Sequence, residues 1–500
     1  MLPDDFENLS ASIVASGAFA NNILSCITTK NYWDIVNTYK PLMHMWYAGL
    51  LMQAHVILPL ILAPIVRFSK TKNRRLQIAV LVLFLCAFTL YLLPVASTAQ
   101  KFYYLPFRLF EFLAGALAAV VPKSLLNHKK KLWCCIFAVS SLGIIILHLS
   151  RTTVISQSFM LVIVVLCTVI DLIALQHISL GESLSIKLVA SIGQASFSIY
   201  VWHQIIVAFM YYCIVPTLNI VSFIEFALIT TVVSVLSYRF IERPFSKIKK
   251  IKSQLVLILI CVLTFLVLSG GAFVCYKNSG VVRDVPELGI REDNIVGGMH
   301  SQYNDRVYSW DVEFVDDERT RVLVFGDSFG RDFANILSES TYADRMQISY
   351  IYISDVSVGV SMEKYQNRIQ CAERIFFAPS ANFDSIPQWL SAIADEEKIY
   401  IVGTKNFGNT NGIIYSKRNK PNYYEQTVRI DQSFISREAS QKHQYGNRYI
   451  SLLDAVMNDK GEVRVFTDDG KFISQDCRHL TQFGAQFYAS VLDFSWLMSK

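Results

Sequence analysis

The sequence carries little charge for its length, and it lacks the residue clusters that mark nucleic-acid-binding or metal-binding proteins. Charged residues make up only 17% of its 500 positions, against 53% hydrophobic residues, whereas an ordinary soluble domain carries about 25% charge. No block rich in Lys and Arg with interleaved aromatic residues occurs, so we expect no nucleic-acid partner. No Cys-x-x-Cys pair occurs either, and we expect no bound metal and no redox site.

Long apolar runs are confined to the first 276 residues, and charged residues, Gly and Asn return to ordinary density after them. This change predicts a membrane domain at 1–276, a linker or extension at 277–320, and a soluble domain at 321–500. A membrane-spanning helix needs about 20 mostly apolar residues. Eight segments approach this length: 45–66, 77–97, 106–122, 132–149, 157–176, 192–214, 219–238 and 254–276.

Loop charges predict the orientation of these spans, because basic loops stay in the cytoplasm. One set of alternate loops, from Arg67 to Lys252, contains sixteen basic residues, and the opposite set contains four. The first set is therefore expected in the cytoplasm, and the last span delivers the soluble domain to the other side. A weaker apolar run at 10–28 is interrupted by Ser and Asn. We expect it to lie along the membrane interface, with a ninth span as the alternative.

Ionisable residues inside apolar segments are costly in a membrane and are candidates for function. Arg108 and Glu111 are three positions apart, which places them on one face of a helix. The alternative interpretation of this pair is a structural ion pair between helices. His203 lies within an apolar run, and His44 comes just before the first firm span. For His203 the alternative is a hydrogen-bonded contact between helices.

The soluble domain begins with a pattern that is typical of a nucleophile at a strand-to-helix turn. Residues 321–325 are typical of a buried strand, and Gly326, Asp327 and Ser328 follow them before a helical stretch. A serine at the start of a helix lies near free N–H groups that favour developing negative charge. Two further apolar strands, near 348–353 and 398–402, alternate with helical stretches, which predicts a parallel α/β sheet.

Asp476 and His479 lie three positions apart in a loop near the end of the chain. Both can reach one serine, with His479 as the base and Asp476 fixing its tautomer. The sequence therefore predicts a catalytic set of Ser328, His479 and Asp476. Cys371 and Cys477 are the only two of the ten cysteines beyond position 275, in the domain expected outside the cytoplasm. A disulfide between them is a hypothesis that suits this compartment.

Together these segments resemble the acyltransferase-3 membrane proteins that carry a fused C-terminal SGNH domain. The Gly-Asp-Ser and Asp-x-x-His-Leu motifs match two SGNH motifs. The other family-like segments lie in the first half of the chain, at 2–6, 41–46, 108–112, 196–203 and 238–244. The resemblance implies a multi-span α-helical membrane domain followed by an α/β SGNH-hydrolase-like domain, which is flavodoxin-like and three-layered.

The resemblance also implies the function, which is O-acetylation of a bacterial surface glycan such as lipopolysaccharide O-antigen. The membrane domain would take an acetyl group from cytoplasmic acetyl-CoA and pass it outward, with no bound cofactor. The SGNH domain would complete the transfer to a sugar hydroxyl through an acyl-serine. The implied location is the inner membrane, in contact with lipid, with the C-terminal domain in the periplasm.

Roles for further residues follow from the resemblance alone. Gly359 and Asn406 would form an oxyanion hole together with the N–H of Ser328. Six residues of the membrane domain would take part in acyl transfer there: His44, Arg108, Glu111, His203, Arg239 and Glu242.

Two departures from the family pattern leave alternatives open. Family members begin with further spans that carry a catalytic-type His and an Arg-x-x-Arg motif, and this chain starts after them. Residues 49–53 read Gly-Leu-Leu-Met-Gln where the family usually has two carboxylates. We therefore expect a truncated, split or diverged protein, and a separate polypeptide supplying the missing spans is a candidate partner. The alternative functions are a membrane-tethered periplasmic acetyl esterase and a non-catalytic fragment.

Overall fold

The computed structural model groups the chain into two compact units, and each is described by itself. The helical unit comprises Leu9–Phe209 and Leu218–Phe273, and the sheet unit comprises Met1–Asn8, Met210–Thr217 and Val274–Lys500. The structure describes residues 1–28, 35–67, 72–120, 130–149, 157–178, 184–215, 217–248, 251–291, 299–353, 362–380, 385–392, 394–474 and 476–498.

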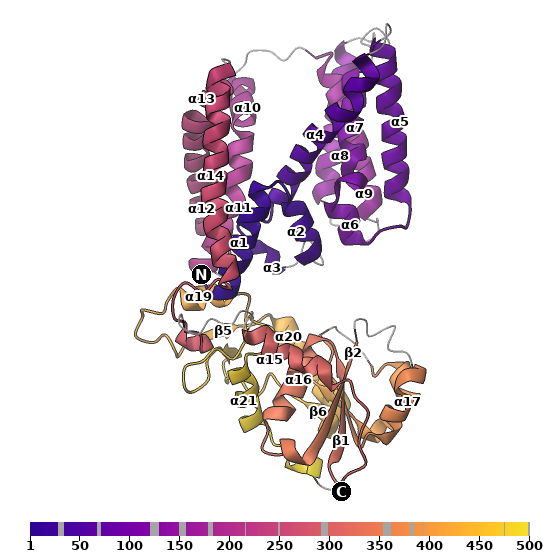
Figure 1. Ribbon diagram of the computed structural model, residues 1–500, viewed down its shortest axis with the longest axis vertical. Coiled ribbons are helices and arrows are strands. Elements are labelled where there is room, and N and C mark those ends of the chain that lie inside the picture. Colours follow the sequence, from indigo (N-terminus) through magenta and orange to yellow (C-terminus); the bar gives the residue numbers. More distant parts are fainter. Residues whose placement is uncertain are drawn as a thin grey trace. The chain divides into compact units, whose positions relative to one another are not determined.

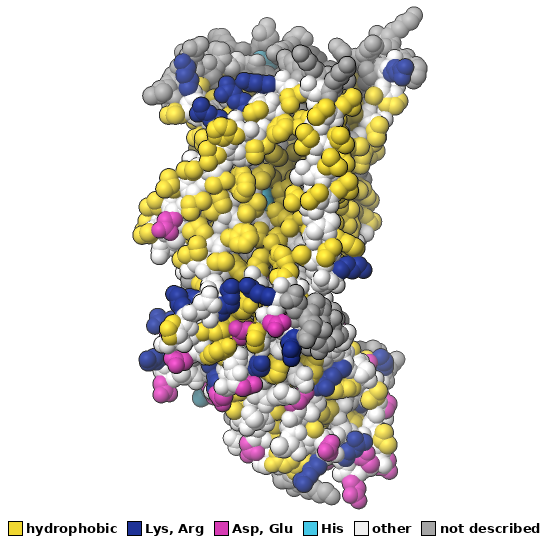
Figure 2. Space-filling view, turned by 60° about the vertical axis from the view of Figure 1, so that its left-hand side comes forward, with side chains coloured by type: hydrophobic (Ala, Val, Ile, Leu, Met, Phe, Trp, Pro, Cys, Tyr) yellow, Lys and Arg dark blue, Asp and Glu magenta, His cyan; other side chains and the backbone are white. Residues whose placement is uncertain are grey.

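The first 277 residues are helical throughout their described parts (Figure 1). The helices are α1 (Pro3–Gly17), α2 (Asn21–Thr28), α3 (Ile35–Thr38), α4 (Met45–Arg67), α5 (Lys72–Leu92), α6 (Thr98–Tyr103), α7 (Leu105–Val120), α8 (Lys130–Leu149), α9 (Gln157–Leu175), α10 (Leu184–Gln194), α11 (Ser196–Cys213), α12 (Ile220–Ser237), the π-helical turn η2 (Tyr238–Glu242), α13 (Arg243–Ser246) and α14 (Ile251–Lys277). Figure 2 shows a mostly hydrophobic outer surface over these helices, as expected for contact with lipid.

Among the described residues, six helical stretches are long and apolar enough to cross a membrane, fewer than the eight predicted. They are Met45–Pro64, Arg74–Leu92, Thr98–Val120, Ser158–Leu175, Ile220–Ser246 and Ser253–Lys277. The predicted segment 132–149 lies within the continuous helix α8, whose described apolar stretch is Leu132–Ile146. The predicted segment 192–214 is divided at Ala195 between α10 and α11. The division at Ala195 was not predicted because hydropathy measures composition and does not show where a helix breaks.

The weak apolar run at 10–28 does not form one continuous helix. It breaks between α1 and α2, where Phe19 adopts a positive φ of 54°. Asn21 and Asn22 of α2 are buried. Their side-chain amides donate to the carbonyl oxygens of Leu42 at 2.8 Å and Tyr103 at 3.1 Å. The polar residues of this run therefore face protein partners, and no single helix of 10–28 spans the membrane.

The sheet unit contains a five-stranded parallel sheet with the strand order β2-β1-β3-β4-β6. Its strands are β1 (Thr320–Gly326), β2 (Met346–Tyr352), β3 (Arg374–Phe377), β4 (Ile399–Val402) and β6 (Tyr449–Ile450). β5 (Thr427–Arg429) and β7 (Glu462–Arg464) form a separate antiparallel pair. The predicted parallel α/β sheet is confirmed, and the order reverses beside β1, which is where such sheets place their ligand sites.

Helices and hydrophobic cores cover both faces of this sheet. Val322 and Val324 of β1 belong to one core, and the alternate residues Leu323 and Phe325 belong to the other. The α-helices are α15 (Met299–Asp305), α16 (Ser328–Glu339), α17 (Met362–Cys371), α18 (Gln388–Ser391), α19 (Asn411–Tyr415), α20 (Gln432–Tyr445) and α21 (Gln482–Val491). The 3₁₀ turns are η3 (Pro286–Leu288), η4 (Arg306–Trp310), η5 (Ala343–Arg345), η6 (Glu396–Lys398), η7 (Gly446–Arg448) and η8 (Ser495–Met498). β1 is apolar on both faces, as expected for a strand that is covered on both sides.

The predicted domain boundary at 276 lies close to Val274, but two earlier segments also belong to the sheet unit. Leu2 is buried in a hydrophobic cluster of this unit. The Tyr212 hydroxyl accepts the N–H of Leu2 at 2.9 Å and donates to the Asp5 carboxylate at 2.7 Å. Composition could not reveal this arrangement, because 1–8 and 210–217 flank apolar helices. Experiments on the sheet unit therefore require the full chain.

The predicted extension at 277–320 packs on the sheet unit over its described part. Val285, Leu288 and Ile290 are buried in the same cluster as Leu2. Val307 of η4 lies in the core on one face of the sheet. This extension is thus part of the fold of the sheet unit.

Candidate active site

Ser328 lies at a tight turn between β1 and α16, and glycine is needed to make that turn. A Cβ added at Gly326 would lie 2.3 Å from the carbonyl oxygen of Ala378 and 2.8 Å from the Cα of Gly330. Ser328 is the first residue of α16, and the Asp327 carboxylate caps the helix by accepting the N–H of Phe329 at 2.9 Å. The turn therefore places the serine hydroxyl at the carboxyl end of β1, beside free N–H groups of the helix.

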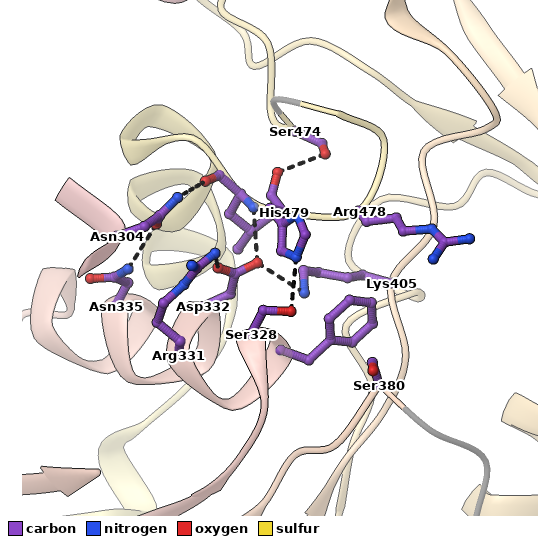
Figure 3. A network of polar contacts seen from close by, with 12 residues as sticks. Asn304, Ser328, Arg331, Asp332, Asn335, Ser380, Lys405, Ser474, Arg478 and His479 are labelled. Atoms are coloured by element: carbon purple, nitrogen blue, oxygen red, sulfur yellow. Dashed lines mark hydrogen bonds and ion pairs between the residues drawn. The ribbon is translucent and has the colours of Figure 1, made fainter. Parts of the chain in front are cut away.

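The structure brings the three predicted catalytic residues together. Figure 3 shows Ser328 and His479 of this set. The Nε2 atom of His479 lies 2.8 Å from the Oγ atom of Ser328, and its Nδ1 atom lies 2.7 Å from the Oδ2 atom of Asp476. The other carboxylate oxygen of Asp476 accepts the backbone N–H of His479 at 2.8 Å. Nδ1 of His479 therefore donates to the carboxylate, which leaves Nε2 to accept the serine proton.

The carboxylate of Asp476 is held in its charged form. The surrounding protein alone would raise the pKa of Asp476, but hydrogen bonds from the His479 ring, the His479 N–H and the Arg478 N–H lower that pKa to about 2. The side chains of His479 and Asp476 are 30% and 52% exposed. An ionised Asp476 can thus stabilise the imidazolium that forms when His479 takes the serine proton.

Replacing Asp476 with asparagine is expected to lower stability in a pH-dependent way. Because the folded-state pKa of Asp476 is about 2 and the unfolded value is about 4, its charge stabilises the fold fully above about pH 4. That contribution is lost as the pH falls toward 2. We expect the difference in unfolding temperature between wild type and Asp476→Asn to shrink over this interval. Thermal unfolding of the full chain in detergent measures it.

Asp459→Asn, on an exposed turn, is the control for removing one surface charge. A difference between wild type and Asp476→Asn that stays constant from pH 6 to pH 2 would contradict the hydrogen-bonding role of Asp476.

The two predicted oxyanion residues have different outcomes. Gly359 lies outside the described residues. Asn406 follows β4, and its Oδ1 atom accepts the N–H of Gly408 at 2.8 Å. With the oxygen engaged in that turn, the amide nitrogen of Asn406 is the atom that can donate to an oxyanion. This role stays a prediction.

The predicted disulfide is not present, because Cys371 and Cys477 are both free thiols. Cys477 is buried in the core on one face of the sheet, and its thiol donates to the Oδ1 atom of Asn411 at 3.2 Å. Cys371 ends α17, whose neighbours Ile369 and Ala372 pack in the core on the other face. The prediction was wrong because the sheet separates the two cysteines.

Two charged residues near the triad were missed by the sequence analysis. Lys405 and Asp332 form an ion pair of 3.0 Å, and both side chains are fully buried. Asp332 comes one helical turn after Ser328 and Lys405 directly precedes Asn406. A carboxylate on the apolar face of the nucleophile helix was the available signal, since a charge is almost never fully buried unless it is paired.

The candidates of the helical unit form separate groups. Arg108 and Glu111 form an ion pair of 3.0 Å on α7, and the Arg108 guanidinium lies 5.3 Å from the ring centre of Phe102. The rings of His44 and His203 lie 5.3 Å apart, edge to face. The structure therefore forms the predicted Arg108–Glu111 pair, and it also brings together His44 and His203, which were predicted only as separate candidates.

Arg239 and Glu242 lie on the π-helical turn η2. The carboxylate of Glu242 accepts a hydrogen bond from the Ser198 hydroxyl at 2.8 Å, which joins two of the family-like segments. Within the described ranges, no group of three or more His, Cys, Asp or Glu residues could hold a metal ion.

One known protein family matches a segment that covers most of the helical unit. Residues 6–239 match the family described as "Acyltransferase domain". The matched segment contains the His44–His203 and Arg108–Glu111 pairs, and it ends before Ser328.

The chain is also similar to the peptidoglycan O-acetyltransferase OatA of Listeria monocytogenes, with 28% identity over 265 residues. This similarity covers 49% of the chain and 42% of that protein, so the chain spans less than half the length of its relative. No solved structure matches the chain. The family match and the relative both support an acyltransferase.

Proposed function

We propose that this protein is a membrane O-acyltransferase that acetylates a cell-surface polysaccharide and completes the transfer at Ser328. The observation that carries this proposal is a hydrogen-bonded Ser328–His479–Asp476 set in a chain whose residues 6–239 match an acyltransferase domain. The strand order and the placement of Ser328 after β1 support an SGNH-type fold for the sheet unit.

In the proposed reaction, Ser328 attacks the carbonyl carbon of an acetyl group while His479 takes the serine proton. The donor leaves with a proton from His479, and an acetyl-serine remains. A sugar hydroxyl then attacks this ester and gives its proton to His479. His479 passes that proton to the Oγ atom of Ser328 as the serine leaves the acetyl group. The N–H groups at the start of α16, with Asn406 and Gly359, would stabilise the oxyanion.

The acyltransferase domain would supply the acetyl group. Acetyl-CoA in the cytoplasm is the proposed donor, and His44, Arg108, Glu111 and His203 are the proposed residues for transfer across the membrane. The excess of basic residues in one set of loops supports an inner-membrane location with the sheet unit in the periplasm. Lipopolysaccharide O-antigen or a similar surface glycan is the proposed acceptor, by analogy with a relative whose name specifies peptidoglycan.

A periplasmic acetyl esterase is the second candidate. The partial exposure of His479 and Asp476 favours it, because water can approach the same triad that would serve a sugar hydroxyl. The two functions use one acyl-serine and differ only in what collects the acetyl group.

The test is complementation in a strain that lacks this gene. The full-length gene and its Ser328→Ala form are expressed, and base-released acetate is measured on purified surface glycan. We expect the wild-type gene to add acetate and Ser328→Ala to add none. Equal acetylation by both would contradict the role of Ser328, and a wild-type gene that removes acetate would establish the esterase.

A further inference from the structure

A fully buried ion pair lies directly beside the proposed catalytic residues (Figure 3). Its carboxylate, Asp332, lies on α16 one helical turn after Ser328, and its ammonium, Lys405, lies in the segment that follows β4. The Lys405 Nζ atom also lies 3.4 Å from the ring centre of Phe329, the residue next to the nucleophile. The ammonium is thus compensated by one carboxylate and the face of one aromatic ring.

Asp332 also holds the loop that carries His479. The same Oδ2 atom that pairs with Lys405 accepts the backbone N–H of Leu480 at 2.9 Å, and Leu480 directly follows His479. The carbonyl oxygen of Leu480 accepts the amide of Asn304 at 3.3 Å, and Asn304 in turn accepts the amide of Asn335 on α16. The peptide groups next to His479 are therefore tied to the nucleophile helix by two routes.

Each residue of this arrangement is close in sequence to a proposed catalytic group. Asp332 follows Ser328 by one turn of helix, Leu480 follows His479, and Lys405 precedes Asn406. Three chain segments, widely separated in the sequence, thus meet at the Asp332 carboxylate. A displacement of about 1 Å between reacting groups can reduce a rate about 100-fold, so the position of this carboxylate bears directly on the triad.

Stability alone is a poor reason for a buried ion pair. Removing two charges from water costs about as much as their attraction returns, and apolar side chains of similar size often serve equally well. We propose that the Lys405–Asp332 ion pair is a positioning device that holds the His479 loop and the Asn406 segment against the Ser328 helix. This inference rests on the proposed function of the triad. Lys405 and Asp332 are positioning residues and act through His479 and Asn406.

The experiment follows the rate at which a fluorophosphonate probe labels Ser328 in the detergent-solubilised full chain, as a function of pH. The variants are Asp332→Asn, Lys405→Met and the double variant Asp332→Leu/Lys405→Met. The double variant removes both charges of this pair. It leaves Arg331, which lies 3.3 Å from the Oδ1 atom of Asp332 in the wild type, with the carboxylate of Asp305 at 3.8 Å. For the double variant we expect an unfolding temperature close to that of the wild type. Its labelling rate should fall by about 10- to 100-fold.

The single variants add a second measurement, the pH midpoint of labelling, which a purely structural ion pair would not shift. The charged groups in this region are Asp476 and Arg478 on the His479 loop, Asp327, Arg331 and Asp332 around α16, Lys405, Asp305 beside Arg331, and Asp5, which interacts with Asp476. Asp332→Asn removes one negative charge near His479 and disfavours the imidazolium, so the midpoint of the labelling profile should move to lower pH. Lys405→Met removes one positive charge and favours the imidazolium, so the midpoint should move to higher pH.

The matched control is Arg368→Met/Asp311→Leu. It removes another ion pair of the sheet unit, whose arginine, Arg368, is also buried. It should change stability without changing the pH midpoint. The proposal would be overturned if the double variant had the wild-type labelling rate and pH midpoint. If the double variant does not fold, the isosteric Asp332→Asn variant decides by the same two measurements. Wild-type labelling that persists in Ser328→Ala would instead overturn the proposed function, and the positioning role with it.

Discussion

Ser328→Ala is expected to abolish covalent labelling of the protein by a fluorophosphonate and to reduce acetyl transfer by about 10⁴-fold or more. Ser328 is the only hydroxyl that the described contacts place on the Nε2 atom of His479, at 2.8 Å. Alanine removes the nucleophile and leaves the base without a proton to accept. Mass spectrometry of the labelled chain and acetate analysis of the glycan measure the two losses.

The control for Ser328→Ala is Ser490→Ala, because Ser490 lies on α21 with an exposed side chain that bonds only within its own helix. It should label at the wild-type rate. Labelling of Ser328→Ala at the wild-type rate would contradict the assignment of the nucleophile. Retained acetylation without labelling would show that transfer bypasses the sheet unit.

Gly326→Ala is expected to disable the site through the backbone. The new Cβ would lie 2.3 Å from the carbonyl oxygen of Ala378, a distance that van der Waals contact does not allow. Either the end of β3 or the turn before Ser328 must move. We expect a loss of about 2–4 kcal/mol in the free energy of unfolding, and a labelling rate near background.

The control for this change is Gly446→Ala at the end of α20. Unlike Gly326, Gly446 has a positive φ, of 54°, and a Cβ there meets no atom within 4 Å. The substitution should cost about 1–3 kcal/mol through backbone strain alone, since the φ of 54° and ψ of −125° form a conformation that favours glycine, and it should leave labelling unchanged. A Gly326→Ala protein that labels at the wild-type rate would show that the turn tolerates a displacement of β3.

The helical segments and the catalytic triad were predictable because both leave local patterns in the sequence. Spans of apolar residues and a strand followed by Gly-Asp-Ser are visible without knowledge of the fold. Asp476 and His479 were found because they lie three positions apart, and together with Ser328 they offer a known chemical arrangement.

Three features were not predictable in this way, because they depend on contacts between distant segments. The pairing of Cys371 with Cys477 was wrong, since only the fold shows that Cys477 is buried on one face of the sheet while the neighbours of Cys371 pack on the other. The membership of residues 1–8 in the sheet unit rests on the burial of Leu2. The Lys405–Asp332 pair was missed, since a lysine and an aspartate 73 positions apart carry no mutual signal.

The sequence by itself therefore determined the division into apolar helices and an α/β region, the parallel sheet, and the three residues that the fold joins as a Ser-His-Asp set. These follow from hydrophobic periodicity and from turn chemistry, which act over a few residues. The tertiary structure alone decided where helices break, which thiols stay free, and which buried charges hold His479 against Ser328. Those outcomes depend on burial, and burial is decided by residues that meet only when the chain is folded.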